Sequence, residues 1–190
     1  YRAAIEAINE ASAPVVAAAK LLGMRTAILE QHALPGLTNR ALGKLVDRVY
    51  ISFEESRRFF PGGRTILSGN PVRRDIITRL EDRRGRAERF SILVFGGSQG
   101  ATAINAAFLD AAEFLTDIWS NLKVVHQTGQ EGFDTVVAAY KRKNLKVEAY
   151  KFIEAMGEAY NSADLVVCRA GATSLAEITA AGLPSILIPY

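Results

Sequence analysis

Short apolar runs alternate along most of the chain with longer segments of helical periodicity. The runs in the first part predict strands at 25–29, 48–52 and 65–67, with helices over 13–22 and 37–45. A second series predicts strands at 91–95, 122–126, 146–150, 164–168 and 185–189, and helices over 101–115, 131–142, 154–162 and 174–181. Strands that alternate with helices form parallel sheets with right-handed crossovers, so the predicted fold class is α/β.

One break in this alternation predicts two domains. Gly69, Asn70 and Pro71 interrupt the pattern, and a charged stretch of mixed sign follows at 79–89. We therefore expect one domain over residues 1–71 and a second over residues 72–190. The last predicted strand has no helix after it to cover it, and the first domain has few strands, so we expect an internal piece of a longer protein.

Residues 96–100, Gly-Gly-Ser-Gln-Gly, join a predicted buried strand to a predicted helix. In an open parallel sheet such a loop lies at the carboxyl edge, where ligands bind. Glycine lets backbone amides approach a ligand closely, and a helix start offers unpaired N–H groups and partial positive charge. The loop therefore predicts a phosphate site, although a tight turn alone would also use glycine. Its members are Gly96, Gly97, Ser98, Gln99 and Gly100.

The loop sequence discriminates between classes of phosphate ligand. A Walker loop requires Gly-Lys followed by Ser or Thr, which this loop does not contain. A dinucleotide fold requires Gly-x-Gly-x-x-Gly and an acidic residue near the end of the next strand, whereas that strand ends in His126 and Gln127. A nucleoside diphosphate attached to a sugar remains.

A second loop of the same kind follows the strand 164–168. It reads Arg-Ala-Gly-Ala over 169–172, and both loops share Gly-Ala-Thr. Two helix starts at one crevice would suit a diphosphate with a ribose beside it. Ser174 and Glu177 also have the spacing of a capping box, as do Ser52 and Glu55. Glu177 is therefore either a capping residue or an acceptor for ribose hydroxyls.

Composition adds few constraints. The chain has 190 residues, of which 49% are hydrophobic and 23% charged, which is typical of globular proteins. The single cysteine, Cys168, cannot form an internal disulfide and forms no metal-ligand cluster with the two histidines. We interpret Cys168 as a buried strand thiol and His126 as an ordered residue at the edge of the crevice, not a base.

Positive charge is concentrated in the first half of the chain. Residues 1–90 carry 16 Lys and Arg against 10 Asp and Glu, whereas residues 91–190 carry 7 against 10. A basic half is typical of ordinary surface charge, of contact with anionic lipid or of a phosphorylated substrate. Nucleic acid is not an expected partner, because the basic residues are not interleaved with stacking aromatic residues.

These motifs together resemble those of the MurG family, the GT-B glycosyltransferases that form lipid II in peptidoglycan synthesis. They appear in the family's order over residues 13–190. The matching stretches are EQHALPGLTNR (30–40), GNPVR (69–73), GGSQGA (96–101), HQTG (126–129), FI (152–153) followed by Met156 and Tyr160, CRAGATSLAE (168–177) and AGLP (181–184).

The resemblance implies two Rossmann-like domains. Residues 1–71 would form the carboxyl-terminal part of the domain that meets acceptor and membrane, and residues 72–190 the truncated UDP-sugar domain. It implies an inverting transfer of N-acetylglucosamine from UDP-N-acetylglucosamine to the C4 hydroxyl of lipid I, undecaprenyl-pyrophosphoryl-N-acetylmuramoyl-pentapeptide, without metal or cofactor. It also implies a peripheral protein on the anionic cytoplasmic face of the bacterial plasma membrane.

The resemblance also implies roles for individual residues. Ser98 and its neighbouring amides would hold the pyrophosphate together with Arg73, and the backbone of Ile153 would meet the uracil. The diphosphate and ribose would lie along the segment 172–177, and the binding role of Glu177 is favoured. That segment consists of Ala172, Thr173, Ser174, Leu175, Ala176 and Glu177.

Departures from the family pattern limit what residues 1–190 can do alone. His32 stands where the family usually has an asparagine, and we assign it a contact with the donor sugar. No catalytic residue is assigned, because the expected base lies upstream of this chain. We expect these residues alone to bind donor weakly and to turn over poorly.

The sequence also permits two other functions. One is another UDP-sugar GT-B enzyme, such as a glycolipid transferase or a 2-epimerase, for which the Glu30-Gln31 stretch and GNPVR fit poorly. The other is a non-catalytic nucleotide-binding module.

Overall fold

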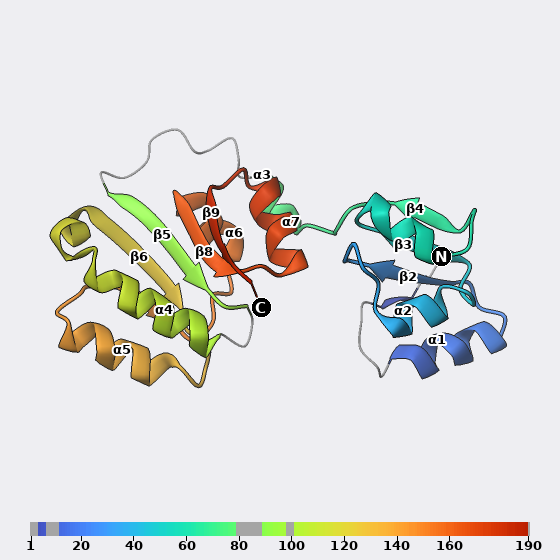
Figure 1. The fold of residues 1–190 in the computed structure, drawn as a ribbon, viewed down its shortest axis with the longest axis horizontal. Helices are drawn as coiled ribbons and strands as arrows, with labels where there is room; N and C mark the ends of the chain where they lie inside the picture. The colour runs from blue at the N-terminus through green and yellow to red at the C-terminus, as the bar shows by residue number, and fades with distance from the viewer. Residues whose placement is uncertain (1–3, 7–11, 79–88, 98–100, 190) are drawn as a thin grey trace. The chain divides into compact units, whose positions relative to one another are not determined.

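The chain forms two compact units, Tyr1–Pro71 (unit 1) and Val72–Tyr190 (unit 2) (Figure 1). The computed structural model describes residues 4–6, 12–78, 89–97 and 101–189. Each unit has its own sheet, and all strand pairs in both sheets are parallel. The predicted α/β class is therefore confirmed.

Unit 1 is built around a four-stranded sheet in the order β1-β2-β3-β4. Every residue of β2 is buried, which explains why this segment shows no alternation of polar and apolar positions. The elements are β1 (Ala4–Glu6), α1 (Ser12–Leu21), β2 (Thr26–Glu30), α2 (Leu37–Leu42), β3 (Arg48–Ile51), the 3-10 helix η1 (Glu54–Phe59) and β4 (Thr65–Leu67). The core consists of Val16, Ile28, Leu42, Val46, Val49, Ile51 and Phe60.

Unit 2 has a five-stranded sheet in the order β7-β6-β5-β8-β9. The chain runs outward from β5 through β6 to β7 and then returns to β8 on the other side of β5, so the direction of winding reverses between β5 and β8. The elements are α3 (Arg74–Thr78), β5 (Phe90–Phe95), α4 (Thr102–Glu113), the 3-10 helix η3 (Thr116–Asn121), β6 (Leu122–Gln127), α5 (Phe133–Arg142), β7 (Glu148–Tyr150), α6 (Met156–Ser162), β8 (Leu165–Arg169), α7 (Ala172–Ala180) and β9 (Ser185–Ile188).

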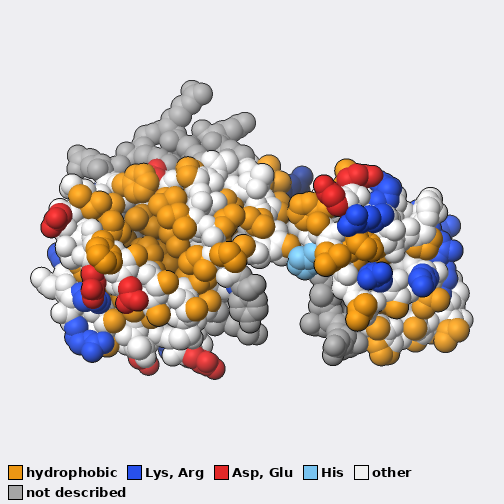
Figure 2. Space-filling view, in the orientation of Figure 1, with side chains coloured by type: hydrophobic (Ala, Val, Ile, Leu, Met, Phe, Trp, Pro, Cys, Tyr) orange, Lys and Arg blue, Asp and Glu red, His pale blue; other side chains and the backbone are white. Residues whose placement is uncertain are grey.

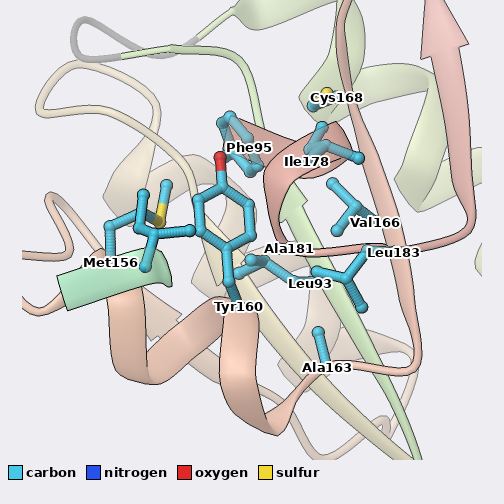
Figure 3. Close-up of a cluster of buried hydrophobic side chains, with 11 residues drawn as sticks. Leu93, Phe95, Met156, Tyr160, Ala163, Val166, Cys168, Ile178, Ala181 and Leu183 are labelled. Carbon is cyan, nitrogen blue, oxygen red and sulfur yellow. The ribbon is translucent and has the colours of Figure 1, made fainter. Parts of the chain in front are cut away.

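Both faces of this second sheet are covered by helices. Successive side chains of a strand point to opposite faces. Ile92 and Val94 accordingly pack with residues of α4 and α5, and Leu93 and Phe95 pack with residues of α3, α6 and α7. Figure 3 shows the second of these clusters around Tyr160. Burial on both faces explains the uninterrupted apolar run in β5.

The predicted capping box at Ser52 and Glu55 is wrong. The residue that precedes η1 is Phe53, and among the described residues no side chain caps that helix. The Ser52 hydroxyl instead donates to Asn70 Oδ1 at 2.7 Å. The Ser52 hydroxyl therefore binds Asn70, 18 positions away in the sequence, and not the start of the helix as the local pattern predicted.

Candidate functional site

A cleft of about 430 Å³ opens in unit 2 at the carboxyl edge of the sheet, beside the strands β5 and β8 where the winding reverses. Open α/β sheets bind ligands at such a switch point, because the loops after the two strands diverge and leave a crevice. The cleft is lined by Arg73, Phe95, Gly97, Gln127, Phe152, Ile153, Met156, Arg169, Gly171, Ala172, Thr173, Ser174 and Glu177.

One wall of the cleft carries the carboxylate of Glu177, and each of its oxygens has a partner. Arg73 Nε donates to Oε1 at 3.1 Å, and the Tyr160 hydroxyl donates to Oε2 at 3.1 Å. The side chain of Glu177 is 10% exposed and that of Arg73 is 48% exposed. The carboxylate is therefore held in one orientation at the cleft, while the side chain of Arg73 remains about half exposed.

Tyr160 supports this carboxylate from the hydrophobic core. Its ring packs edge-on against Phe95, with 6.0 Å between ring centroids (Figure 3). Burial, together with the neighbouring charge of Glu177, raises the pKa of the Tyr160 hydroxyl well above its usual range. The hydroxyl therefore stays protonated at neutral pH and acts as a donor to Glu177.

The alternative that made Glu177 a capping residue is wrong. The helix α7 begins at Ala172 after Gly171, so Ser174 lies inside its first turn, and among the described residues no side chain caps it. Glu177 is bonded to Arg73 and Tyr160 instead. The first-turn N–H groups of a helix have no partner within the helix, and Thr173 and Ser174 place that turn at the cleft.

A buried amide joins two other walls of the cleft. Gln127, at the end of β6, is 1% exposed. Its Nε2 donates to the Gly97 carbonyl at 2.9 Å, and its Oε1 accepts from the Ile153 N–H at 2.7 Å. Gly97 follows β5 and Ile153 follows β7, so one side chain connects the loops after the two strands beside its own.

The backbone at Gly97 is shaped for close approach. Its φ of +102° lies where side chains are rarely tolerated, and a Cβ atom placed there would lie 3.3 Å from Arg169 Nη2. The guanidinium of Arg169 thus packs over this glycine, from the end of the neighbouring strand β8. Two guanidinium groups, those of Arg73 and Arg169, line the same cleft.

The structure brings together half of the site residues predicted from sequence. Arg73, Gly97, Ile153, Ala172, Thr173, Ser174 and Glu177 line one cleft. Leu175 and Ala176 lie in α7 but are not among the lining residues. Gly96 is buried and does not line the cleft either. Ser98, Gln99 and Gly100 lie outside the described residues.

His32 lies in unit 1, after β2, and its side chain is 58% exposed. Its backbone N–H donates to Glu30 Oε1 at 2.9 Å, and Asn39 Nδ2 donates to Glu30 Oε2, also at 2.9 Å. The buried carboxylate of Glu30 therefore organises the EQH turn. The contact of His32 with a donor sugar stays a prediction.

His126 is not at the edge of the crevice, contrary to our interpretation from sequence. It is fully buried, with Nδ1 2.9 Å from the Tyr140 hydroxyl and Nε2 3.1 Å from Asn105 Oδ1. These partners lie in α5 and α4, so the ring points to the sheet face covered by those helices. Burial lowers the pKa of His126 to about 4, which keeps it neutral.

Cys168 is the buried strand thiol that the sequence predicted. It is 0% exposed within β8, and burial raises the pKa of its thiol to about 11. A thiol in that state is a poor nucleophile.

Sequence reasoning did not assign Gln127, Arg169 or Tyr160 to the site. All three occurred in quoted motifs, but their partners lie far away along the chain. Gln127 and Arg169 directly follow the predicted strands 122–126 and 164–168. This position was the available signal, because the carboxyl ends of parallel strands share one edge.

Two α/β units with parallel sheets, and a cleft at the switch point of the second sheet, are the architecture of a GT-B type protein. The model of the glycosyltransferase family 28 C-terminal domain matches residues 91–190. The chain belongs to this glycosyltransferase family.

Curated relatives extend the similarity over almost the whole chain. The UDP-N-acetylglucosamine--N-acetylmuramyl-(pentapeptide) pyrophosphoryl-undecaprenol N-acetylglucosamine transferase of Syntrophus aciditrophicus is 48% identical over 180 residues, which cover 95% of this chain and 50% of that protein. The protein of the same name from Myxococcus xanthus is 50% identical over 180 residues, covering 95% of this chain and 47% of the relative. The chain thus spans about half the length of these relatives.

Solved structures show the same fold. The crystal structure of Acinetobacter baumannii MurG has a TM-score of 0.71 and 32% identity, and the match covers 99% of this chain and 52% of that one. A putative UDP-N-acetylglucosamine 2-epimerase from Listeria monocytogenes has a TM-score of 0.62 at 12% identity, covering 93% of this chain and 53% of the other. The second likeness concerns the fold alone. The GT-B class expected from the resemblance is therefore confirmed.

Proposed function

We propose that this chain is part of an inverting transferase that moves N-acetylglucosamine from UDP-N-acetylglucosamine to the C4 hydroxyl of lipid I and so forms lipid II. The observation that carries the proposal is the cleft beside β5 and β8, with the fixed pair of Arg73 and Glu177 on one wall. The names of relatives at 48% and 50% identity support the choice of donor and acceptor.

The donor would lie along the cleft, with its diphosphate between the loop after β5 and the loop after β8. The phosphates would contact Gly97, Arg73 and the first turn of α7. The uracil would contact the backbone of Ile153, and the ribose hydroxyls would bind Glu177. Glu177 is prepared for that role, because Arg73 and Tyr160 orient its carboxylate before any ligand arrives. Ser98 is assigned to the pyrophosphate from the sequence alone.

The cleft would stabilise the charge that develops during transfer. The acceptor hydroxyl oxygen forms a bond to C1 of the sugar while the bond from C1 to the UDP oxygen breaks, and the hydroxyl proton passes to a base. Negative charge then grows on the departing UDP. Guanidinium groups and helix N–H groups held in place beforehand stabilise such charge without reorganising during the reaction.

We further propose that the protein works as a peripheral protein at the anionic cytoplasmic face of the plasma membrane. No helix in the described part of the chain is long and apolar enough to span a bilayer. Unit 1 exposes Leu21 (89%) and Leu22 (78%) between Lys20 and Arg25. Figure 2 shows hydrophobic and basic side chains side by side on this unit. Such a surface suits anionic lipid headgroups.

Donor competition tests the proposed function. We expect UDP-N-acetylglucosamine to bind in preference to UDP-glucose, UDP-N-acetylgalactosamine and NAD. Glu177→Gln is expected to weaken donor binding roughly tenfold or more, because the neutral amide cannot hold the Arg73 guanidinium and the ribose at once. The measurement is calorimetric titration of each variant.

Glu113→Gln is the matched control for this substitution. Glu113 also forms a salt bridge, with Lys143, but at the surface end of α4 away from the lining residues of the cleft. Its loss should leave donor affinity unchanged. Strong binding of NAD, or an equal effect of both substitutions, would contradict the proposed site.

A further inference from the structure

Gln127 uses the two ends of its side-chain amide to bind the backbone of two loops at the cleft, at Gly97 and at Ile153. It lies at the last position of β6, and β6 is the strand between β5 and β7. The loops that it joins therefore begin at strands that do not pair with each other. The two hydrogen bonds of Gln127 link described residues of these two loops, Gly97 and Ile153.

The two ends of the amide have different chemical roles. At the β5 side, Nε2 donates to the Gly97 carbonyl at 2.9 Å, which fixes the peptide at the start of the predicted phosphate loop. At the β7 side, Oε1 accepts from the Ile153 N–H at 2.7 Å, which fixes the peptide predicted to meet the uracil. An amide supplies one donor and one acceptor group in fixed geometry, which these two peptides require.

Burial makes both hydrogen bonds important. Gln127 is 1% exposed, so water does not replace a bond that is lost. The neighbouring residue His126 points to the opposite face of the sheet, where it binds Asn105 and Tyr140. Because successive side chains of a strand point to opposite faces, Gln127 points to the sheet face that carries the cleft. Its backbone pairs with β5 on one side and with β7 on the other.

We infer that Gln127 is a positioning residue that sets the spacing between the base-binding loop and the phosphate-binding loop. This inference rests on the proposed function. Gln127 acts through the Gly97 carbonyl and the Ile153 N–H. It contributes to two separable properties, the preference for uracil and the affinity gained from the diphosphate.

Two substitutions separate these properties. Gln127→Met keeps the approximate length of the side chain but removes both hydrogen bonds. Gln127→Glu keeps an acceptor for the Ile153 N–H, but an ionised carboxylate cannot donate to the Gly97 carbonyl. Titration of the full chain with uridine, UDP and CDP measures both properties: the ratio of UDP to uridine affinity reports the diphosphate, and the ratio of UDP to CDP affinity reports the base.

The expected results differ between the variants. Gln127→Met should reduce both ratios, each by roughly tenfold, the size of one hydrogen bond. Gln127→Glu should reduce the UDP-to-uridine ratio by a similar factor and leave the UDP-to-CDP ratio near that of the unsubstituted protein. Equal loss of affinity for all three ligands in both variants would overturn the inference, because a general loss of structure changes no ratio.

Trp119→Phe is the matched control. Trp119 is also buried and its Nε1 donates to a backbone carbonyl, that of Lys146, at 3.0 Å, but it is not a lining residue of this cleft. It should lower stability without changing either ratio. If the unsubstituted protein fails to bind UDP, the proposed function fails. If it binds UDP and both Gln127 variants keep both ratios, only the inference about Gln127 fails.

Discussion

The imidazole of His126 has a defined tautomer although it takes no part in the cleft. Asn105 Nδ2 donates to the Thr128 carbonyl at 2.8 Å, so Asn105 Oδ1 remains as the acceptor for the ring. His126 Nε2 therefore carries the proton and donates to Asn105, while Nδ1 accepts from the Tyr140 hydroxyl. This network needs a neutral ring, because a protonated Nδ1 could not accept.

That requirement predicts a pH dependence of stability. Burial lowers the pKa of His126 from 6.5 to about 4, so between these values the unfolded chain binds more protons than the folded chain. The contribution of His126 is fully present above about pH 6.5 and is lost as the pH falls towards 4. The whole shift corresponds to ~3 kcal/mol. Urea unfolding across this range measures it.

His126→Gln isolates this contribution, because glutamine does not titrate. The free energy of unfolding of this variant should fall less steeply between about pH 6.5 and pH 4 than that of the unsubstituted protein. Parallel pH curves would show that His126 is not the group responsible.

At the level of elements, Gly97 gives the backbone directly after β5 a conformation that favours glycine. Gly97→Ala is expected to destabilise unit 2 by about 1–2 kcal/mol, because φ at this position is +102°. It should also weaken UDP binding, since the new Cβ would press on the Arg169 guanidinium. Thermal unfolding and titration with UDP measure the two effects.

Gly182→Ala provides the control for backbone strain alone. Gly182 also has a positive φ, +58°, but an added Cβ there would meet nothing within 4 Å. This substitution should lower stability and leave UDP affinity unchanged. The same loss of affinity in both variants would mean that Gly97 acts only through overall stability.

At the same scale, sequence patterns predict the buried strands well and the helix starts poorly. The strands β5, β6 and β8 lie within one residue of the predicted ranges. In β5 and β8, burial on both faces leaves an apolar run that few other structures produce. The helix α7 begins two residues before the predicted start, because Gly171 takes the position before it without a side-chain cap. The short elements β1, α3, η1 and η3 were not predicted.

The candidate site was predictable to the extent that it is local. Gly97, Gly171 and the helix start of α7 have signatures within a few residues, and these described residues line the cleft. The bonds from Gln127 to Gly97 and from Tyr160 to Glu177 join residues 30 and 17 positions apart. Their partners are a backbone carbonyl and a carboxylate, which leave no periodic pattern in the sequence.

For the whole molecule, two separate cores predict separate responses to ligand. The core of unit 1 and the two clusters of unit 2 share no residue. Because the described lining residues of the cleft all belong to unit 2, UDP should slow hydrogen–deuterium exchange there, most of all around β5, β8 and α7. Exchange in β2 and β3 should stay unchanged. Protection confined to unit 1 would contradict this assignment.

The pairing of β5 with β8 also governs when the cleft appears during folding. Ser91 and Asp164, which are bonded where these strands begin, are 73 positions apart in the chain. Closing so long a segment costs more entropy than pairing β5 with β6, β6 with β7 or β8 with β9, which are nearer in sequence. A newly synthesised chain therefore brings the loops after β5 and β8 together only after β8 has been made, when β5, β6 and β7 can already have paired.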